Sequence, residues 1–193
     1  MSKLQCDRLD VILVHFPGAN DAVQSPTRNR KLRADTWRAL EALHADGLCR
    51  AIGVSNYNRR HLKEVLSSCT TVPHVLQTEL HPRFQQRELI TYARAAGIGT
   101  IMAHCPLAHG SAALLEDGTL RSLASARGCT PAQLCLRWSI DNGFVPVPKA
   151  QRLPRLRENL AAAAMAPLSS TERAAIDALD CDDRVSFDPS LIA

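Results

Sequence analysis

The stretch Leu9-Asp-Val-Ile-Leu-Val-His15-Phe16 is an almost continuous apolar run, rich in β-branched residues, that stops at Pro17-Gly18. A strand that is apolar on both faces is typical of a parallel sheet, because helices cover both faces of such a sheet. The stretch therefore predicts a buried parallel strand. Parallel strands need helical crossovers between them, so the rest of the chain is expected to alternate strands with helices.

Strand and helix patterns do alternate along the rest of the sequence. Further strands are predicted at residues 49–54, 74–80, 98–103 and 144–147, and helices at 36–46, 59–69, 86–96, 120–127, 131–141 and 153–164. Residues 17–35 are expected to form a polar, arginine-rich loop. The capping box Ser169-x-x-Glu172 predicts a final short helix. Since no hairpin signal separates any two strands, the predicted fold class is α/β.

The spacing of these units is close to that of a (β/α)8 barrel, in which one unit takes roughly 30 residues. About five units fit into 193 residues, with extra helices at the C-terminal end, so a partial (β/α)8 TIM barrel is expected. Barrels of this kind carry their chemistry on the loops that follow the strands. An open flavodoxin-like sheet is the alternative, but the chain has neither G-x-G-x-x-G nor G-x-x-x-x-G-K-[ST].

Composition excludes several classes of protein. With 46% hydrophobic and 22% charged residues the chain can bury a core and is not expected to be disordered. A net charge of +4 falls short of a nucleic-acid-binding signature. The basic clusters at 28–33 and 59–61 are interpreted as solvated loop and helix-start charge rather than phosphate sites. No signal core or membrane-length apolar run occurs, so a cytoplasmic protein without membrane contact is expected.

Cysteine and histidine spacing indicates neither disulfides nor a metal. The seven cysteines form an odd set without a C-x-x-C pair. Cys49, Cys105 and Cys135 lie in apolar segments and are interpreted as small buried side chains. His104 and His109 stand on one expected loop but lack a third ligand, so no metal site is predicted.

The stretch Phe144-Val-Pro-Val-Pro-Lys-Ala150 predicts a phosphate site. A short strand runs directly into Lys149, and Arg155 and Asn159 follow at helical spacing. A strand end that brings cations to the start of a helix can hold a phosphate.

Four motifs occur in order along the chain, and together they resemble the aldo-keto reductase family. Leu9–Pro17, Ala51–Asn56 and Leu76–Pro82 are similar to its fourth, fifth and sixth barrel strands. Residues 145–149, with Arg155, Glu158 and Asn159, are similar to its eighth. The resemblance implies one domain over residues 1–193 that lacks the first three β/α units. It implies NADPH-dependent reduction of aldehydes or ketones without a metal, a small-molecule carbonyl substrate, and a monomer.

The resemblance also implies roles for residues at the strand ends. His15 would hydrogen-bond the carbonyl oxygen of the substrate, although a structural role for this histidine is equally open. Ser55, Asn56 and Gln77 would hold the nicotinamide carboxamide, whose donors and acceptor suit amide and hydroxyl partners. The alternative for Ser55 and Asn56 is a helix cap. His104 would stand where the family usually has a stacking aromatic residue.

Further along the chain, the resemblance implies the rest of the cofactor site. Cys105 replaces the usual serine, and Leu107 belongs to the same cofactor-binding loop. Lys149 and Arg155 would neutralise the extra ribose phosphate of NADP(H), and Glu158 and Asn159 would meet the adenine. The alternative for Glu158 is a surface ion pair with Arg155, three residues earlier.

The family's catalytic tyrosine, lysine and aspartate come from its first three strands and have no counterpart here. The two tyrosines, Tyr57 and Tyr92, have no aspartate four residues before them. Residues 1–10 resemble the passage into the fourth strand and are interpreted as an internal start or an incomplete gene model. Whether the polypeptide is an enzyme stays open: it is either an impaired oxidoreductase or a non-catalytic protein that binds a nucleotide or a partner. Unpaired edges on the first and last strands would favour self-association.

Overall fold

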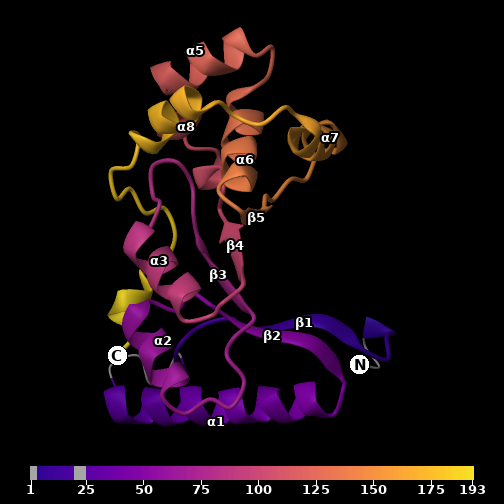
Figure 1. Cartoon of the computed structure of the whole chain (residues 1–193), viewed down its shortest axis with the longest axis vertical. Coiled ribbons are helices and arrows are strands. Elements are labelled where there is room, and N and C mark those ends of the chain that lie inside the picture. The colour runs from indigo at the N-terminus through magenta and orange to yellow at the C-terminus, as the bar shows by residue number, and fades with distance from the viewer. Residues whose placement is uncertain (1–3, 20–24) are drawn as a thin grey trace. The chain divides into compact units, whose positions relative to one another are not determined.

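The computed structural model describes residues 4–19 and 25–193, which divide into two compact units (Figure 1). Unit 1 comprises Met1–Thr78, Arg87–Ile101 and Asp188–Ala193, and unit 2 comprises Glu79–Gln86 and Met102–Phe187. Each unit is described separately below.

The sheet contains the five strands that the sequence predicts. They are β1 (Leu9–Val14), β2 (Cys49–Ser55), β3 (Val75–Glu79), β4 (Thr100–His104) and β5 (Phe144–Val147), in the order β1-β2-β3-β4-β5. β2 pairs in parallel with both β1 and β3, with Val54 opposite Val14 on one side and Leu76 on the other. The strand positions are therefore confirmed, with ends that differ by no more than two residues. The prediction that the first strand is buried is wrong: no residue of β1 is fully buried and Val11 is 42% exposed, because β1 stands at one end of the strand order.

Eight α-helices connect or follow the strands of the described chain. They are α1 (Pro26–Ala45), α2 (Arg59–Leu66), α3 (Arg87–Ala95), α4 (Ala112–Leu115), α5 (Gly118–Ala126), α6 (Pro131–Asp141), α7 (Leu153–Ala161) and α8 (Ser170–Asp177). Short 3-10 turns lie at Ala108–Gly110, Ala162–Ala164 and Pro189–Leu191. α4 lies in a segment that the sequence predicted to be a loop.

The first half of α1 contradicts the prediction of a loop up to residue 35. The helix begins at Pro26, and its first half buries Asn29 and Arg33 rather than apolar residues. Arg33 donates to Glu64 (Nη2–Oε2, 2.6 Å) and to the carbonyl oxygen of Pro17 (2.6 Å). Because the buried side chains are polar, no apolar helical period marks this half. The interpretation of residues 28–33 and 59–61 as solvated charge is wrong for Arg33 and for His61, which is 0% exposed.

Unit 1 has its core between the sheet and its helices, and Figure 1 shows α1 running along β1 and β2. Ile52 and Val54 of β2 are fully buried, as is Leu62 of α2. Trp37 of α1 is 2% exposed, and its indole nitrogen donates to the carbonyl oxygen of Thr71 (3.1 Å).

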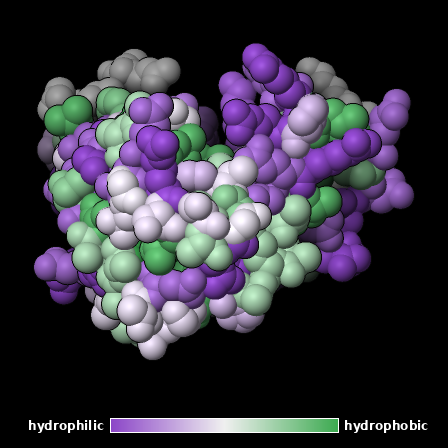
Figure 2. Space-filling view, turned by 90° about the horizontal axis from the view of Figure 1, so that it is seen from above, coloured by the Kyte–Doolittle hydropathy of each residue, from purple (hydrophilic) through white to green (hydrophobic). Residues whose placement is uncertain are grey.

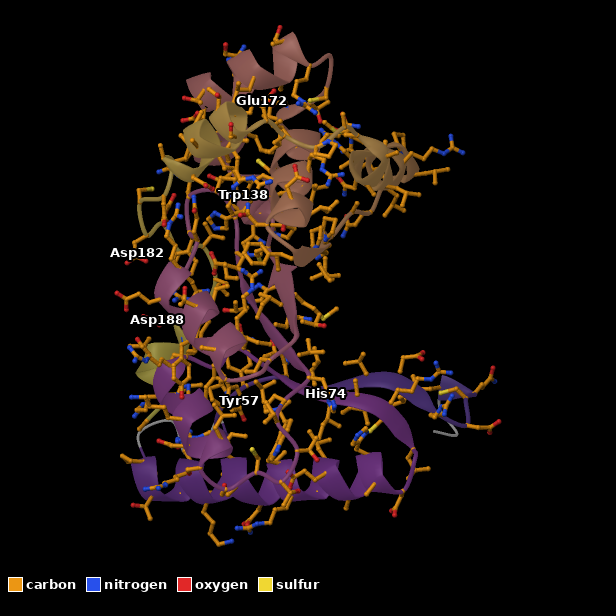
Figure 3. The ribbon with its side chains drawn as sticks, viewed as in Figure 1. Tyr57, His74, Trp138, Glu172, Asp182 and Asp188 are labelled. Carbon is orange, nitrogen blue, oxygen red and sulfur yellow. The ribbon has the colours of Figure 1, made fainter. Side chains whose placement is uncertain are left out.

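Unit 2 has its core around α6. The Thr130 hydroxyl accepts from the backbone of Gln133 (3.2 Å), whose side chain accepts in return from the backbone of Thr130 (3.0 Å). This capping box and Pro131 confirm the predicted helix start. Trp138, labelled in Figure 3, is buried, and its indole donates to Asp177 of α8 (2.8 Å). The predicted box from Ser169 to Glu172 also starts α8 as expected.

Replacement of Gly53 by alanine is expected to destabilise unit 1 by about 1–3 kcal/mol, the usual cost of overpacking a core. A Cβ atom at Gly53 would lie 2.5 Å from the Val75 carbonyl oxygen and 2.7 Å from Leu13 Cδ2. Urea unfolding measures the effect. Gly99→Ala is the matched control, because nothing lies within 4 Å of a Cβ atom there. Equal stability of the two variants would contradict the expected clash.

Some apolar side chains remain exposed on the described surface. Leu153, Leu156 and Leu160 of α7 are 57%, 47% and 75% exposed, and Val145 and Val147 of β5 are also exposed. On the face drawn in Figure 2, hydrophobic residues are interspersed with hydrophilic ones. β1 and β5 stand at the two ends of the strand order, so self-association through strand edges stays a prediction. None of the described helices is both long and apolar enough to span a bilayer.

Candidate functional site

Four of the predicted site residues gather in unit 1, at the carboxyl ends of neighbouring strands. His15 follows β1, Ser55 ends β2, Asn56 follows it, and Gln77 lies in β3. The Asn56 side-chain amide donates to the His15 carbonyl oxygen (3.0 Å) and to the Ser55 hydroxyl (3.1 Å). The Asn56 backbone N–H donates to the Gln77 carbonyl oxygen (2.9 Å). The structure therefore brings these four residues together, as predicted.

The hydrogen bonds of Asn56 depend on its backbone conformation. Its φ is +60°, a left-handed conformation that asparagine adopts more readily than most residues. Asn58, two residues later, is the cap of α2, and its side chain accepts from the backbone of His61 (3.1 Å). The alternative interpretation of Ser55 and Asn56 as the helix cap is therefore wrong. Both are buried, whereas the His15 side chain is exposed.

A cleft of about 800 Å³ in unit 2 brings together most of the other predicted residues. They are His104, Cys105, Leu107, Lys149, Arg155 and Asn159. His109 and Arg152 also line the cleft, and no aspartate or glutamate is among its lining residues. The described lining is thus rich in cations and without carboxylates, which suits an anionic ligand.

The end of β5 and the start of α7 place the cations of this cleft. β5 ends at Val147, Pro148 follows, and Lys149 comes next. Arg152 is the residue that precedes α7, and Arg155 lies in the first turn of that helix. The first backbone N–H groups of a helix have no partner within it and favour anions. The residues predicted to hold a phosphate thus line one cleft, and phosphate binding there stays a prediction.

Glu158 has a different environment from its predicted neighbours. Its carboxylate accepts from the Thr130 hydroxyl (2.6 Å) at the start of α6 and pairs with Arg155 Nη1 (3.1 Å). It is not among the residues that line the cleft. The alternative, an ion pair with Arg155, is present in the structure, and contact with adenine stays a prediction.

The cysteine prediction is confirmed in part. All seven cysteines are free thiols, and Cys49 and Cys135 are buried as predicted. Cys105 is half-buried and lines the cleft, so its interpretation as a small core residue is wrong. Its segment is apolar, but the chain turns at Cys105, where φ is +49°. No group of three His, Cys, Asp or Glu side chains suited to a metal occurs among the described residues.

Neither tyrosine is among the residues that line the unit 2 cleft. Tyr57, labelled in Figure 3, is 1% exposed in the core of unit 1. Burial raises the pKa of its hydroxyl, against a smaller opposite effect of Arg33. The guanidinium carbon of Arg59 lies over the ring of Tyr92, 5.1 Å from the centre of that ring.

The sequence pattern gives neither His109 nor Arg152 a role in this cleft. His109 belongs only to a histidine pair without a third metal ligand, and Arg152 stands one residue before its helix. The signal that could have located Arg152 is its position before Leu153-Pro154, since proline marks the first turn of a helix. His109 gives no comparable signal, because an irregular turn brings it to the cleft.

Comparisons with known proteins agree with these observations. A family model described as "Aldo/keto reductase family" matches residues 1–181. The chain is 43% identical over 157 residues to the uncharacterized oxidoreductase ZK1290.5 of Caenorhabditis elegans, matching 81% of this chain and 47% of that protein. It is 39% identical over 189 residues to the glyoxal reductase of Bacillus subtilis (strain 168), matching 98% of this chain and 63% of that enzyme.

Solved structures show the same fold. The structure of Gox0644 in its apo form matches 97% of this chain and 65% of its own, with a TM-score of 0.86 and 32% identity. A mutant of Gox0644 in complex with NADPH matches with a TM-score of 0.84 and 34% identity, over 95% of this chain and 64% of its own. The prediction of a partial (β/α)8 barrel is confirmed. The chain spans between about half and two thirds of the length of these proteins.

Proposed function

Because the chain belongs to the aldo-keto reductase family, we propose that residues 1–193 form one reductase-like domain that binds NADP(H). With the family's first three β/α units, such a domain would reduce aldehydes or ketones to alcohols. The observation that carries this proposal is the cleft of unit 2, where Lys149, Arg152 and Arg155 surround a space without carboxylates. The chain's expected cytoplasmic location stays a prediction from its sequence.

The donor set of this cleft fits the phosphate-bearing half of NADP(H). Lys149 supplies a compact charge, and Arg155 can offer two parallel N–H groups to one phosphate. The Arg155 side chain is 65% exposed, so it can turn toward a ligand from its pairing with Glu158. His104 and Leu107 offer a ring and an apolar side chain to the same cleft.

The strand-end group of unit 1 supports the nicotinamide assignment. Ser55 and Asn56 are held in place by the hydrogen bonds described above, so their polar atoms need no large rearrangement on binding. His15 is exposed after β1, where its imidazole can donate a hydrogen bond to a carbonyl oxygen. The bound cofactor would supply the hydride. The residues of this chain would orient the carboxamide and polarise the carbonyl.

Reversal of charge at Arg155 is expected to weaken binding of the 2′-phosphate about tenfold, the scale of one hydrogen bond between charged groups. Calorimetric titration with adenosine 2′,5′-bisphosphate measures the affinity of Arg155→Glu. AMP, which lacks the 2′-phosphate, is the reference ligand. Arg121→Glu, an exposed arginine of α5 outside the cleft, is the matched control.

Loss of the preference for the 2′-phosphate in Arg155→Glu, with the preference intact in Arg121→Glu, would support the assignment. Equal binding of both ligands by the unmodified chain would refute it.

A second candidate is a non-catalytic protein that uses the same cleft to bind a nucleotide or a partner. The absence of a tyrosine that matches the family's catalytic position favours it for this polypeptide. Nucleotide binding without turnover would support this candidate. Self-association through strand edges is tested by the concentration dependence of the mass measured by light scattering.

A further inference from the structure

A thiol and an imidazole lie side by side at the wall of the unit 2 cleft. The Sγ atom of Cys105 is 3.4 Å from Nε2 and 3.9 Å from Nδ1 of His109. Both residues line the cleft, with Cys105 half-buried and His109 exposed. The family resemblance implies no role for His109. For Cys105 it implies only that this residue replaces the usual serine of the family.

The turn between the two residues holds them in this arrangement. Cys105, Ala108 and His109 have φ values of +49°, +45° and +56°. The Ala108 N–H donates to the Cys105 carbonyl oxygen (2.8 Å), and the Gly110 N–H donates to that of Leu107 (2.7 Å). The backbone therefore reverses direction and directs the side chains of residues 105 and 109 to the same side.

The charge of the cleft around this pair determines which reactants it attracts. Lys149, Arg152 and Arg155 line the same space, and no carboxylate does. A concave site lined by charges of one sign raises the local concentration of the opposite charge and speeds its arrival. Anionic reactants are therefore favoured over cationic ones at Cys105.

Cys105 needs a base in order to react. Burial, and then the negative charge of Glu79, raise the pKa of the Cys105 thiol. Since the thiolate is the reactive form of cysteine, a thiol in this environment reacts slowly without help. A neutral His109 ring nitrogen at 3.4 Å can accept the proton as the sulfur attacks.

We propose that Cys105 is a site of mixed-disulfide formation with anionic low-molecular-weight disulfides, and that His109 is its proton acceptor. Glutathione disulfide represents the class. The Cys105 sulfur attacks one sulfur of the reactant and forms a new S–S bond, while its proton passes to His109. The old S–S bond breaks, and the departing thiolate takes up a proton. The reactant disulfide is the oxidant, so no other redox partner is needed.

One experiment compares glutathione disulfide with cystamine, a cationic disulfide, by peptide mass mapping over time. Cys181, which is exposed, serves as the internal reference. Cys105 is expected to favour glutathione disulfide over cystamine about tenfold more strongly than Cys181 does, at the low end of electrostatic steering. The same charge preference at both cysteines would overturn the proposal, as would the absence of any adduct at Cys105.

A second experiment separates proton transfer from a structural role of His109. His109→Asn is expected to slow modification of Cys105 about 10²-fold, the lower range for loss of a general base, without affecting Cys181. Free imidazole in the buffer is expected to restore part of the rate. An unchanged rate, or a loss that imidazole does not restore, would overturn the role of His109. Circular dichroism confirms that the variant is folded.

A third measurement rests on the proposed function and separates its failure from that of the thiol inference. Adenosine 2′,5′-bisphosphate is expected to protect Cys105, and not Cys181, from glutathione disulfide. Modification without protection would leave the thiol site standing and refute nucleotide binding in this cleft. Nucleotide binding without any adduct at Cys105 would support the nucleotide site and refute the thiol site.

Discussion

An activated aldehyde mixed with NADPH and this chain is expected to be reduced at least ~10²-fold more slowly than by the glyoxal reductase of Bacillus subtilis, since neither tyrosine of this chain matches the general acid that the family resemblance implies. Hydride addition to a carbonyl leaves a negative oxygen that needs a proton. Tyr57 is enclosed in the core of unit 1, and Tyr92 lies under Arg59. Among the residues assigned to the site in unit 1, His15 alone carries an exposed titratable side chain.

Consumption of NADPH, followed by its absorbance, measures this rate. The glyoxal reductase of Bacillus subtilis under the same conditions is the reference, since it is 39% identical over 98% of this chain. Binding of NADPH must be titrated on the same sample, so that lack of turnover is not confused with lack of cofactor. Turnover comparable with that of the reference enzyme would mean that another group in this chain donates the proton.

Removal of the Glu79 carboxylate by Glu79→Ala is expected to cost about 3–5 kcal/mol of stability, as for other broken buried charge networks. Glu79 is 1% exposed in unit 2, at the end of β3. It accepts from His81 Nε2 (3.1 Å), Val185 N (2.7 Å) and Ser186 N (2.9 Å), and from the Ser186 hydroxyl. Without the carboxylate, these buried donors lose their acceptor, and residues 185–186 lose their anchor on β3.

The same carboxylate is expected to make unit 2 sensitive to acid. Burial by itself raises the pKa of Glu79, but the hydrogen bonds from His81, Ser186 and Val185 outweigh burial and lower the pKa from 4.5 to about 2. A lowered pKa in the folded state stabilises the protein above the ordinary pKa. That contribution, about 3 kcal/mol, is lost as the pH falls from 4.5 toward 2.

Urea unfolding of the unmodified chain and of Glu79→Ala at neutral pH tests the stability cost. Urea unfolding of the unmodified chain and of Glu79→Gln between neutral pH and pH 2 tests the acid sensitivity. The variant is expected to be less stable at neutral pH and to lose less stability in acid. Glu116→Ala is the matched control, because Glu116 is exposed in the same unit. If Glu79→Gln and the unmodified chain lost stability in parallel, the carboxylate would not be the group responsible.

Much of the fold could be predicted because it depends on local patterns. β1 is marked by an apolar run rich in β-branched residues, and α6 by a threonine cap followed by proline. The part of the site that lies at strand ends could also be predicted, because the carboxyl ends of parallel strands lie at the same edge of the sheet. His15, Ser55, Asn56 and Gln77 do meet there.

The sequence by itself determined the alternation of strands and helices, their caps and the cations that follow β5, since each depends on residues a few positions apart. Tertiary structure alone decided that Arg33 is buried against Glu64, that Glu158 faces Thr130, and that Cys105 meets His109 on a cleft. The first two pairings join residues distant in sequence, and the third requires a left-handed turn. Local sequence periodicity does not predict such contacts, because they form only when the chain has folded.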